Sequence, residues 1–458
     1  MSIHPTKSIV AVAACSLTLL VGGCESIGDS FDSINPFAEK ELILPGERRE
    51  IAANIDPAGN PLMERKAVGV PQARSVADWS QPGGNAANNP GNVALSSGSG
   101  ARAWRTKIPT ESGGGFGVFG SSDNLRVSSR PIAYQGRVVV YDPSGSLSSF
   151  SLSSGGRAWS IKLRPKDEPD IAPGGGVAAD QGMIFVATGY SSVSAVSPSN
   201  GQTIWTKELE APARSAPTAS GGKVYVVTQT NVIVALDQKD GNELWSYRGI
   251  PEAAGVLSAA APAVSGDTVI VPYSSGEVIA LNTKTGEVRW TEAISRSYRT
   301  LAVSGLSDVA ASPVIDGGTV FATGLAGRII AVGIRKGNRI WEQDVGSAHT
   351  PVVTPSAVYL VDLNDRVIAL NRKSGAVMWA TQLPIVRTKK KNTNWAGPVL
   401  ASGALWLVSN EGSIAAVAAG TGEVISNRDL GAPGYLPPIA ASGKLVIVTG
   451  KGDLTALN

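Results

Sequence analysis

The fold is decided by the stretch at residues 223–245, KVYVVTQTNVIVALDQKDGNELW. Two apolar runs, residues 224–227 and 232–236, are separated by four polar residues. After the second run, a turn that begins at Asp237 and ends at Gly241 leads into a final run that holds Trp245. Runs rich in β-branched residues between Asn, Asp and Gly are typical of strands and turns. No helical periodicity is present. The stretch therefore predicts antiparallel strands joined by tight turns.

The same unit recurs along the chain. A Gly-x-x-x-Trp motif occurs seven times at spacings of 38 to 55 residues, and its tryptophans are Trp104, Trp159, Trp205, Trp245, Trp290, Trp341 and Trp379. An eighth copy, Gly422 to Ser426, lacks the Trp. A second marker keeps step at intervals of 38 to 51 residues: Pro131, Pro173, Pro217, Pro262, Pro313, Pro351, Pro398 and Pro438. This period is typical of the four-stranded blades of a β-propeller. Aromatic residues at one register in every blade are predicted to dock each sheet on the next.

The two ends of the repeat region complement one another. The C-terminal Leu454–Asn458 matches residues 278–282 but is not followed by a Gly-x-x-x-Trp motif, whereas Gly100–Trp104 has no strands before it. Joining the two completes one blade and removes open sheet edges. The predicted fold is all-β: an eight-bladed β-propeller of four-stranded antiparallel blades, over residues 94–458, closed by pairing of N- and C-terminal segments.

The segment before the propeller has the features of an exported lipoprotein. Residues 1–23 contain Lys7 and then an apolar run of about 13 residues, too short to span a membrane and typical of a signal peptide. The string Leu20–Cys24 resembles the bacterial lipobox, which implies lipidation of Cys24 and a membrane anchor. Residues 24–93, rich in turn formers, are predicted to be the acylated N-terminus and a flexible tether, on which Trp79 is the one large side chain expected to dock.

Composition argues against several kinds of function. The net charge is only +3, and no basic stripe indicates nucleic-acid binding. Both cysteines, Cys15 and Cys24, precede the propeller, and His4 and His349 are the only histidines. A zinc site or a histidine base is therefore not expected in the globular part. Asp362 and Asp365 lack the further acids of a calcium loop, so we interpret them as turn residues, and we predict no metal site and no cofactor.

The repeat is similar to that of quinoprotein propellers, which bind pyrroloquinoline quinone (PQQ). Across the chain, a lipobox followed by eight such blades resembles the BamB family of outer-membrane protein assembly factors, most clearly at residues 358–370 and at Leu306–Val309. The resemblance implies a non-enzymatic lipoprotein on the periplasmic face of the outer membrane. It also implies a monomer within a hetero-complex that binds the POTRA domains of the barrel-assembly protein BamA.

The resemblance carries over to a few site residues. Asp308 matches one member of an acidic pair in the family, but the second position is Ala310. Val256 and Leu257 correspond to part of an interface loop, here without its arginine. These three residues are the candidates for partner binding, although Asp308 also fits a turn acid and the other two a cover for the blade edge. The basic stretch at Arg387 and 389–391 fits a solvated loop or a contact with a partner or a lipid headgroup.

Two other functions remain open from the sequence. A PQQ-dependent dehydrogenase would share the blade repeat, but the globular part lacks the vicinal cysteines that the resemblance to such enzymes implies. A propeller that binds a polymer of the cell envelope is the other alternative.

Overall fold

The computed structural model describes residues 66–97, 100–109, 129–250, 260–294, 309–325, 327–385 and 393–458, all of which belong to one compact unit, residues 55–458. Among these residues there is no helix long and apolar enough to span a membrane. The predicted site residues Cys24, Val256, Leu257 and Asp308 lie outside the described residues, as does the basic stretch at 387–391.

The described residues form strands in eight sheets of four. Blades 1 to 4 are β2 (Ile132–Tyr134), β3 (Arg137–Tyr141), β4 (Ser146–Ser151), β5 (Arg157–Lys162); β6 (Gly175–Asp180), β7 (Met183–Thr188), β8 (Ser192–Val196), β9 (Thr203–Glu208); β10 (Thr218–Ser220), β11 (Lys223–Val227), β12 (Val232–Asp237), β13 (Glu243–Arg248); and β14 (Ala263–Ser265), β15 (Thr268–Pro272), β16 (Glu277–Asn282), β17 (Val288–Ala293). Blades 5 to 8 are β18 (Val314–Asp316), β19 (Thr319–Thr323), β20 (Ile329–Gly333), β21 (Arg339–Gln343); β22 (Val352–Val353), β23 (Ala357–Val361), β24 (Arg366–Asn371), β25 (Val377–Gln382); β26 (Trp395–Ala401), β27 (Ala404–Ser409), β28 (Ser413–Ala418), β29 (Val424–Asp429); and β30 (Ile439–Ala441), β31 (Lys444–Val448), β32 (Asp453–Leu457), β1 (Arg102–Lys107).

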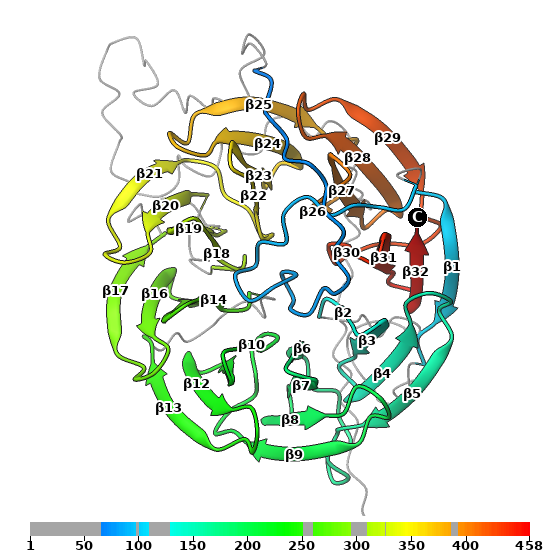
Figure 1. Ribbon diagram of the computed structural model, residues 1–458, viewed down its shortest axis with the longest axis vertical. Coiled ribbons are helices and arrows are strands. Elements are labelled where there is room, and N and C mark those ends of the chain that lie inside the picture. The colour runs from blue at the N-terminus through cyan, green and yellow to red at the C-terminus, as the bar shows by residue number, and fades with distance from the viewer. Residues whose placement is uncertain are drawn as a thin grey trace, which may run out of the picture. The chain divides into compact units, whose positions relative to one another are not determined.

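The blades form a closed ring, which confirms the predicted eight-bladed propeller (Figure 1). The first strand of each blade lies nearest the axis and contacts the first strands of both neighbouring blades. In blades 1 to 7 the strands run outward in chain order. Blade 8 takes its outermost strand, β1, from the N-terminal side: β1 pairs antiparallel with β32, with Trp104 opposite Ala456. The predicted closure by the two ends of the repeat region is confirmed.

The burial of each strand explains its sequence. Middle strands such as β11 (KVYVV) are buried on both faces between neighbouring blades and are almost entirely apolar. The outermost strands alternate between exposed and less exposed positions, as in TIWTKE of β9. The innermost strands carry small residues such as Ala133, Ala219 and Ala263, which are fully or almost fully buried where the ring is narrowest.

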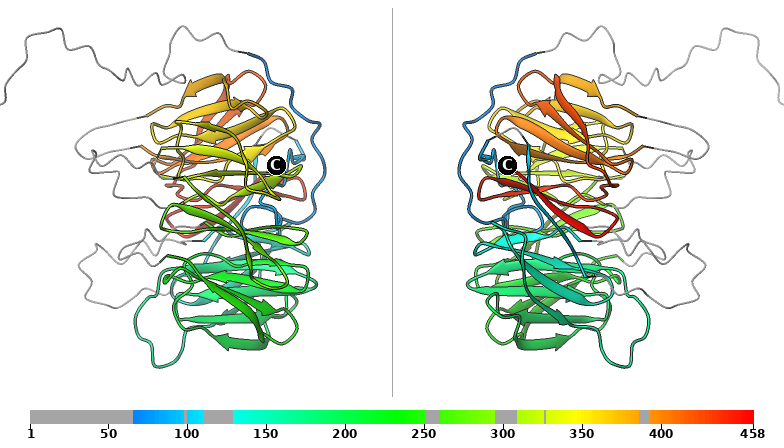
Figure 2. Two further views of the ribbon diagram at one scale, coloured as in Figure 1. Left: turned by 90° about the vertical axis from the view of Figure 1, so that its left-hand side faces the viewer. Right: turned by 90° about the vertical axis from the view of Figure 1, so that its right-hand side faces the viewer.

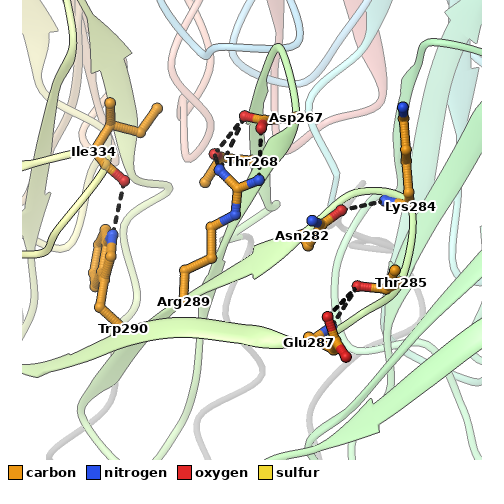
Figure 3. A network of polar contacts seen from close by, with 9 residues as sticks. All are labelled: Asp267, Thr268, Asn282, Lys284, Thr285, Glu287, Arg289, Trp290 and Ile334. Carbon is orange, nitrogen blue, oxygen red and sulfur yellow. Dashed lines mark hydrogen bonds and ion pairs between the residues drawn. The ribbon is translucent and has the colours of Figure 1, made fainter.

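The repeated glycine and tryptophan meet between blades. A Cβ atom on Gly286 of blade 4 would come within 2.7 Å of the Trp245 ring of blade 3, and the same close approach recurs at the other tryptophans of the motif. Indole groups also donate to the next blade: Trp290 Nε1 lies 2.8 Å from the carbonyl oxygen of Ile334 (Figure 3). In blade 7, where Ser426 replaces the tryptophan, Gly100 of blade 8 lies against Arg428 and Trp406 instead.

Substituting Gly286 by alanine is expected to destabilise the propeller by about 2–4 kcal/mol, because the φ of +74° strains an L-residue and the new methyl group overlaps the Trp245 ring. Gly266→Ala is the matched control. Its φ is +58° and a Cβ there meets nothing within 4 Å, so it should cost only about 1–2 kcal/mol. Urea unfolding of both variants measures the difference. Equal losses of stability in the two variants would show that the close packing of Gly286 against the Trp245 ring does not require a glycine.

The ring has two different faces. We call the face that carries the turns between first and second strands, and between third and fourth strands, the turn face. The loop face carries the turns between second and third strands and the connections from each blade to the next. Figure 2 shows the N-terminal segment, in blue, along one side of the ring. This side is the turn face, because the segment bonds at the ends of the first strands, for example Ser96 N to Gly443 O (2.8 Å).

Residues 66–93 correct one part of the predicted tether. They pack on the propeller rather than forming a flexible chain, and Val68, Trp79 and Val93 are buried there. The chain meets the outer edge of blade 6, where Lys66 N donates to Met378 O, and then passes to blade 7, where Val68 N donates to Gly420 O (both 2.9 Å). The signal peptide and the remainder of the tether, up to residue 65, lie outside the described residues.

Candidate functional site

The axis of the ring is occupied on the turn face by residues 74–96, which we call the axial segment (Figure 1). It follows the inner strands around the ring. Ser442 N of blade 8 donates to Val76 O, Trp79 exchanges two bonds with Ala133 of blade 1, and Ala179 N of blade 2 donates to Ser80 O, all at 2.7–2.9 Å. These bonds satisfy the free edges that the innermost strands present to the axis.

The same pattern continues through the other half of the ring. Val264 N of blade 4 donates to Ala86 O (2.6 Å) and Ile315 N of blade 5 donates to Ala87 O (3.0 Å). In blade 7, Val93 N donates to Leu400 O (3.2 Å) and its carbonyl accepts from Ser402 N (2.8 Å). The axial segment thus joins blades that are far apart in sequence.

Two buried amide side chains bridge pairs of blades. Gln81 Nε2 donates to Ala179 O of blade 2 and to Ala219 O of blade 3 (2.9 and 3.0 Å), and its Oε1 accepts from Ala219 N. Asn88 Nδ2 donates to Pro313 O of blade 5 (2.9 Å) and makes a longer bond to Pro262 O of blade 4 (3.4 Å). Each side-chain amide therefore bonds to backbone groups of two neighbouring blades, and so satisfies polar groups that are buried at the axis.

Trp79 anchors the axial segment on blade 1. Its side chain is 2% exposed and belongs to the apolar cluster that blades 1, 7 and 8 share. The Arg130 guanidinium lies 5.4 Å from the Trp79 ring centroid, in a cation–π contact, and donates to Pro438 O of blade 8. Burial lowers the pKa of Arg130 to about 9, so this side chain remains a cation at neutral pH.

His349 is the one histidine of the described residues and lies near this cation. Burial, and then the charge of Arg130, lower the pKa of His349 to about 4, while its bond to the Trp395 backbone acts in the opposite direction. The imidazole is therefore neutral at pH 7. A neutral, partly buried histidine beside a fixed cation could accept a proton only at a cost to the fold, so it has no evident role as a base.

The fold should lose stability as the pH falls from about 6.5 towards 4, because in that window the unfolded chain binds a proton at His349 that the folded chain does not. The full difference amounts to about 3 kcal/mol. Urea unfolding at pH 7 and pH 4.5 measures it, and His349→Gln should remove this part of the acid sensitivity while leaving that of the carboxylates. An identical pH dependence in the wild type and the variant would contradict this role of His349.

A pocket with a free volume of about 20 Å³ lies among Trp79, Asn88, Arg130, Pro351 and Leu400, with room for about one water molecule. A quinone cofactor of the kind that quinoprotein propellers bind does not fit this pocket. Within the described part of the chain there is also no group of three His, Cys, Asp or Glu residues that could hold a metal ion.

Asp362 and Asp365 serve the turn between β23 and β24 and its neighbours. Asp362 accepts from the backbone of Asn364 and Arg366 (2.9 and 2.8 Å) and pairs with the Arg366 side chain. Asp365 Oδ1 accepts from Trp395 N of blade 7 (2.8 Å). Asp362 therefore stabilises its own turn, and Asp365 links blade 6 to blade 7.

The two connections that hold the predicted partner residues begin and end on the same face, although those residues themselves lie outside the described residues. Val256 and Leu257 fall between β13 and β14, and Asp308 falls between β17 and β18. Both connections join the outermost strand of one blade to the innermost strand of the next, so both begin and end on the loop face. The two connections enter blades 4 and 5, which are neighbours in the ring.

Sequence reasoning missed the axial segment. Its residues lack apolar periodicity, and their polar side chains bond to strand edges far away in the chain. Turn motifs such as 81–85 and 88–92 look the same in a free linker. The buried Trp79 was the one signal of docking.

Comparisons with known proteins agree with the architecture. The family model described as "Outer membrane protein assembly factor BamB" matches residues 143–381. Curated proteins of that name from Yersinia pestis and Escherichia coli K12 are each 28% identical over 362 and 361 residues, which is 78% of this chain and 88% of theirs.

Solved structures show the same fold. The crystal structure of BamB from Moraxella catarrhalis aligns with a TM-score of 0.65 at 19% identity, over 78% of this chain and 99% of that one. A quinohemoprotein alcohol dehydrogenase from Comamonas testosteroni aligns with a TM-score of 0.64 at 13% identity, over 84% of this chain and 81% of that one. At such identities the structural likeness establishes the fold alone. The family model and the curated relatives identify the family: the chain belongs to the family of the outer membrane protein assembly factor BamB.

Proposed function

We propose that this chain is a non-enzymatic scaffold of the outer-membrane β-barrel assembly machinery, which binds the POTRA domains of a BamA-like barrel protein and aids insertion of outer-membrane proteins. The observation that carries the proposal is membership of the BamB family. The structure adds a physical reason. The axial segment bonds to blades 1 to 5, 7 and 8, which holds the ring together across its axis and lets the loop face serve as one frame for a partner.

The loop face is the proposed partner surface. The connections that hold Val256, Leu257 and Asp308 enter two neighbouring blades, so one partner domain can contact both. Ile250, at the start of the first connection, is 54% exposed and adds apolar surface there. Val256 and Leu257 would supply apolar anchors and Asp308 a charge that selects a basic partner residue.

Binding of the purified protein to the isolated POTRA domains tests this surface. Leu257→Asp and Asp308→Arg are each expected to weaken binding at least tenfold, about 1.4 kcal/mol, because a charge enters an apolar contact or a charge pair reverses. Lys239→Glu, on the turn face, is the control and should bind like the wild type. Unchanged binding of both loop-face variants, with intact unfolding curves, would exclude this surface.

The proposed anchor is a lipidated Cys24 on the periplasmic face of the outer membrane. Several acyl chains would hold the chain stably at a membrane surface. Mass spectrometry of the N-terminal peptide from the mature protein measures the modification directly, and Cys24→Ser should release the protein from the membrane fraction.

A PQQ-dependent dehydrogenase is the alternative that the fold neighbours suggest. Its test is a quinone absorbance in the purified protein or binding of added PQQ with calcium. A saturable, calcium-dependent PQQ complex would overturn the scaffold proposal in favour of the enzyme.

A further inference from the structure

One sector of the turn face carries unpartnered positive charge. The turns between the third and fourth strands of blades 4, 5 and 6 (residues 283–287, 334–338 and 372–376) hold five basic residues and one acidic residue, Glu287. The equivalent turns of blades 1, 2, 3 and 7 hold one basic residue, Lys239, and two acidic residues, Asp240 and Glu423. The charge is therefore local to neighbouring blades.

Most of these cations are exposed and have no partner. Lys284, Arg335, Lys336 and Lys373 are all exposed, and none forms an ion pair or a side-chain hydrogen bond within the described residues. The fifth, Arg372, is instead paired with Asp316 of blade 5. We call the four exposed residues the basic turn patch. Figure 3 shows the Lys284 side chain extending away from its turn.

Nearby acids are already occupied. The Arg289 guanidinium bonds to both oxygens of Asp267 (2.9 and 2.6 Å) and holds the pKa of that carboxyl at about 2 (Figure 3). Arg339 likewise pairs with Glu292 and Glu342 on the outer strands of blades 4 and 5. Asp267, Glu292 and Glu342 are therefore paired without the patch, and Glu287 accepts from the Thr285 hydroxyl (3.0 Å). The four cations of the patch outnumber this one acid, so a net positive charge remains available for an external anion.

The N-terminal chain reaches the propeller beside this patch. Lys66, itself exposed, bonds to β25 of blade 6, whose turn carries Lys373. Between Lys66 and the proposed anchor at Cys24 lie 41 residues, which as a flexible coil would span about 35 Å root-mean-square. An anchored chain would thus hold the patch at a high effective concentration near the membrane, where even a weak contact is occupied.

We propose that the basic turn patch docks the propeller, turn face down, on an anionic phospholipid surface. The inference rests on the proposed lipid anchor. Each Lys or Arg close to such a surface raises partitioning onto the membrane about fivefold, equivalent to about 1 kcal/mol. The contributions of the four residues of the patch add to one another. Docking in this orientation leaves the loop face, with its partner connections, directed away from the bilayer.

The test measures which face lies nearer the bilayer. The lipidated protein is reconstituted in vesicles that contain 30 mol% phosphatidylglycerol and a headgroup-linked acceptor dye. A donor dye is placed either at Ser374→Cys, on the turn face, or at Leu363→Cys, on the loop face of the same blade; both positions are exposed. Energy transfer from position 374 should exceed that from 363 at least twofold in 0.1 M salt. The excess should vanish in pure phosphatidylcholine and in 1 M salt.

Two variants with the same change in net charge distinguish an effect of the basic turn patch from an effect of net charge. The fourfold reversal K284E/R335E/K336E/K373E should abolish the excess, whereas R102E/R157E/K166E/K451E, with the same change in net charge at exposed positions elsewhere, should retain it. Equal transfer from both faces in anionic vesicles would overturn the proposal. Greater transfer from position 363 would also overturn it, because the loop face would then lie nearer the bilayer. Protein that lacks an acylated N-terminal peptide would instead contradict the proposed anchor, which is a separate result.

Discussion

Replacing Trp79 by alanine should lower the free energy of unfolding by about 3–5 kcal/mol, the range for loss of a buried tryptophan. The side chain is 2% exposed, packs in the cluster shared by blades 1, 7 and 8, and contacts the Arg130 cation. Its loss removes the apolar anchor of the axial segment and leaves Arg130 without its aromatic partner. Guanidinium unfolding measures the change.

Two controls define what that loss means. Trp79→Phe keeps an aromatic face for Arg130 and should recover roughly half of the lost stability. Leu95→Ala, at a partly buried position of the same segment, should cost only about 1 kcal/mol. If Trp79→Ala costs no more than Leu95→Ala, the axial segment does not stabilise the ring, and the proposed frame would lose its physical basis.

The second large effect is expected at Trp379, the most buried tryptophan of the repeat motif. It is 0% exposed, its ring centroid lies 5.9 Å from that of Tyr359, and it packs in one cluster with Val68 and Val70 from the N-terminal segment. Trp379→Ala should therefore cost about 3–5 kcal/mol. The same unfolding experiment measures it.

Trp104→Ala is the comparison for Trp379, because Trp104 holds the equivalent position in blade 8 but is only partly buried. It should cost about 2 kcal/mol, since less apolar surface is lost, together with the indole bond to Leu152 O (3.0 Å). Equal losses at the two positions would show that the cover from residues 68–70 contributes nothing to blade 6.

The ring was predictable because its rules are local and repeated. Strand alternation, the turn glycine and the blade-docking tryptophan recur at one register, so each copy supports the others. Even the departure in blade 7 was visible as Ser426. The residues that replace the missing tryptophan were not predictable, because Arg428 and Trp406 reach Gly100 from positions that no repeat rule specifies.

The axial segment was not predictable for a different physical reason. Linkers and buried caps share the same polar, turn-forming residues, and only their hydrogen-bond partners distinguish them. Gln81 is 2% exposed because the strand edges of blades 2 and 3 satisfy its amide. Those edges exist only after the ring has closed, so no pattern within residues 74–96 could reveal them.

The proposed partner residues were indicated by family resemblance, and not by a repeated local pattern. Family resemblance indicates Asp308, Val256 and Leu257, and the connections that hold them begin and end on the loop face. Their departures from the family pattern, Ala310 and the missing arginine, mean that an interface here would differ in its contacts from those of relatives. The basic turn patch adds an orientation in which such an interface would face away from the membrane.

The most direct measurement is affinity purification of the tagged, lipidated protein from detergent-solubilised membranes, with mass spectrometry of the proteins that co-elute. We expect a POTRA-containing barrel protein in near-stoichiometric amount. We also expect that protein to be lost in the Leu257→Asp and Asp308→Arg variants. Recovery of oxidoreductase components alone, with no barrel-assembly protein, would contradict the scaffold function and restore the enzyme as the better account.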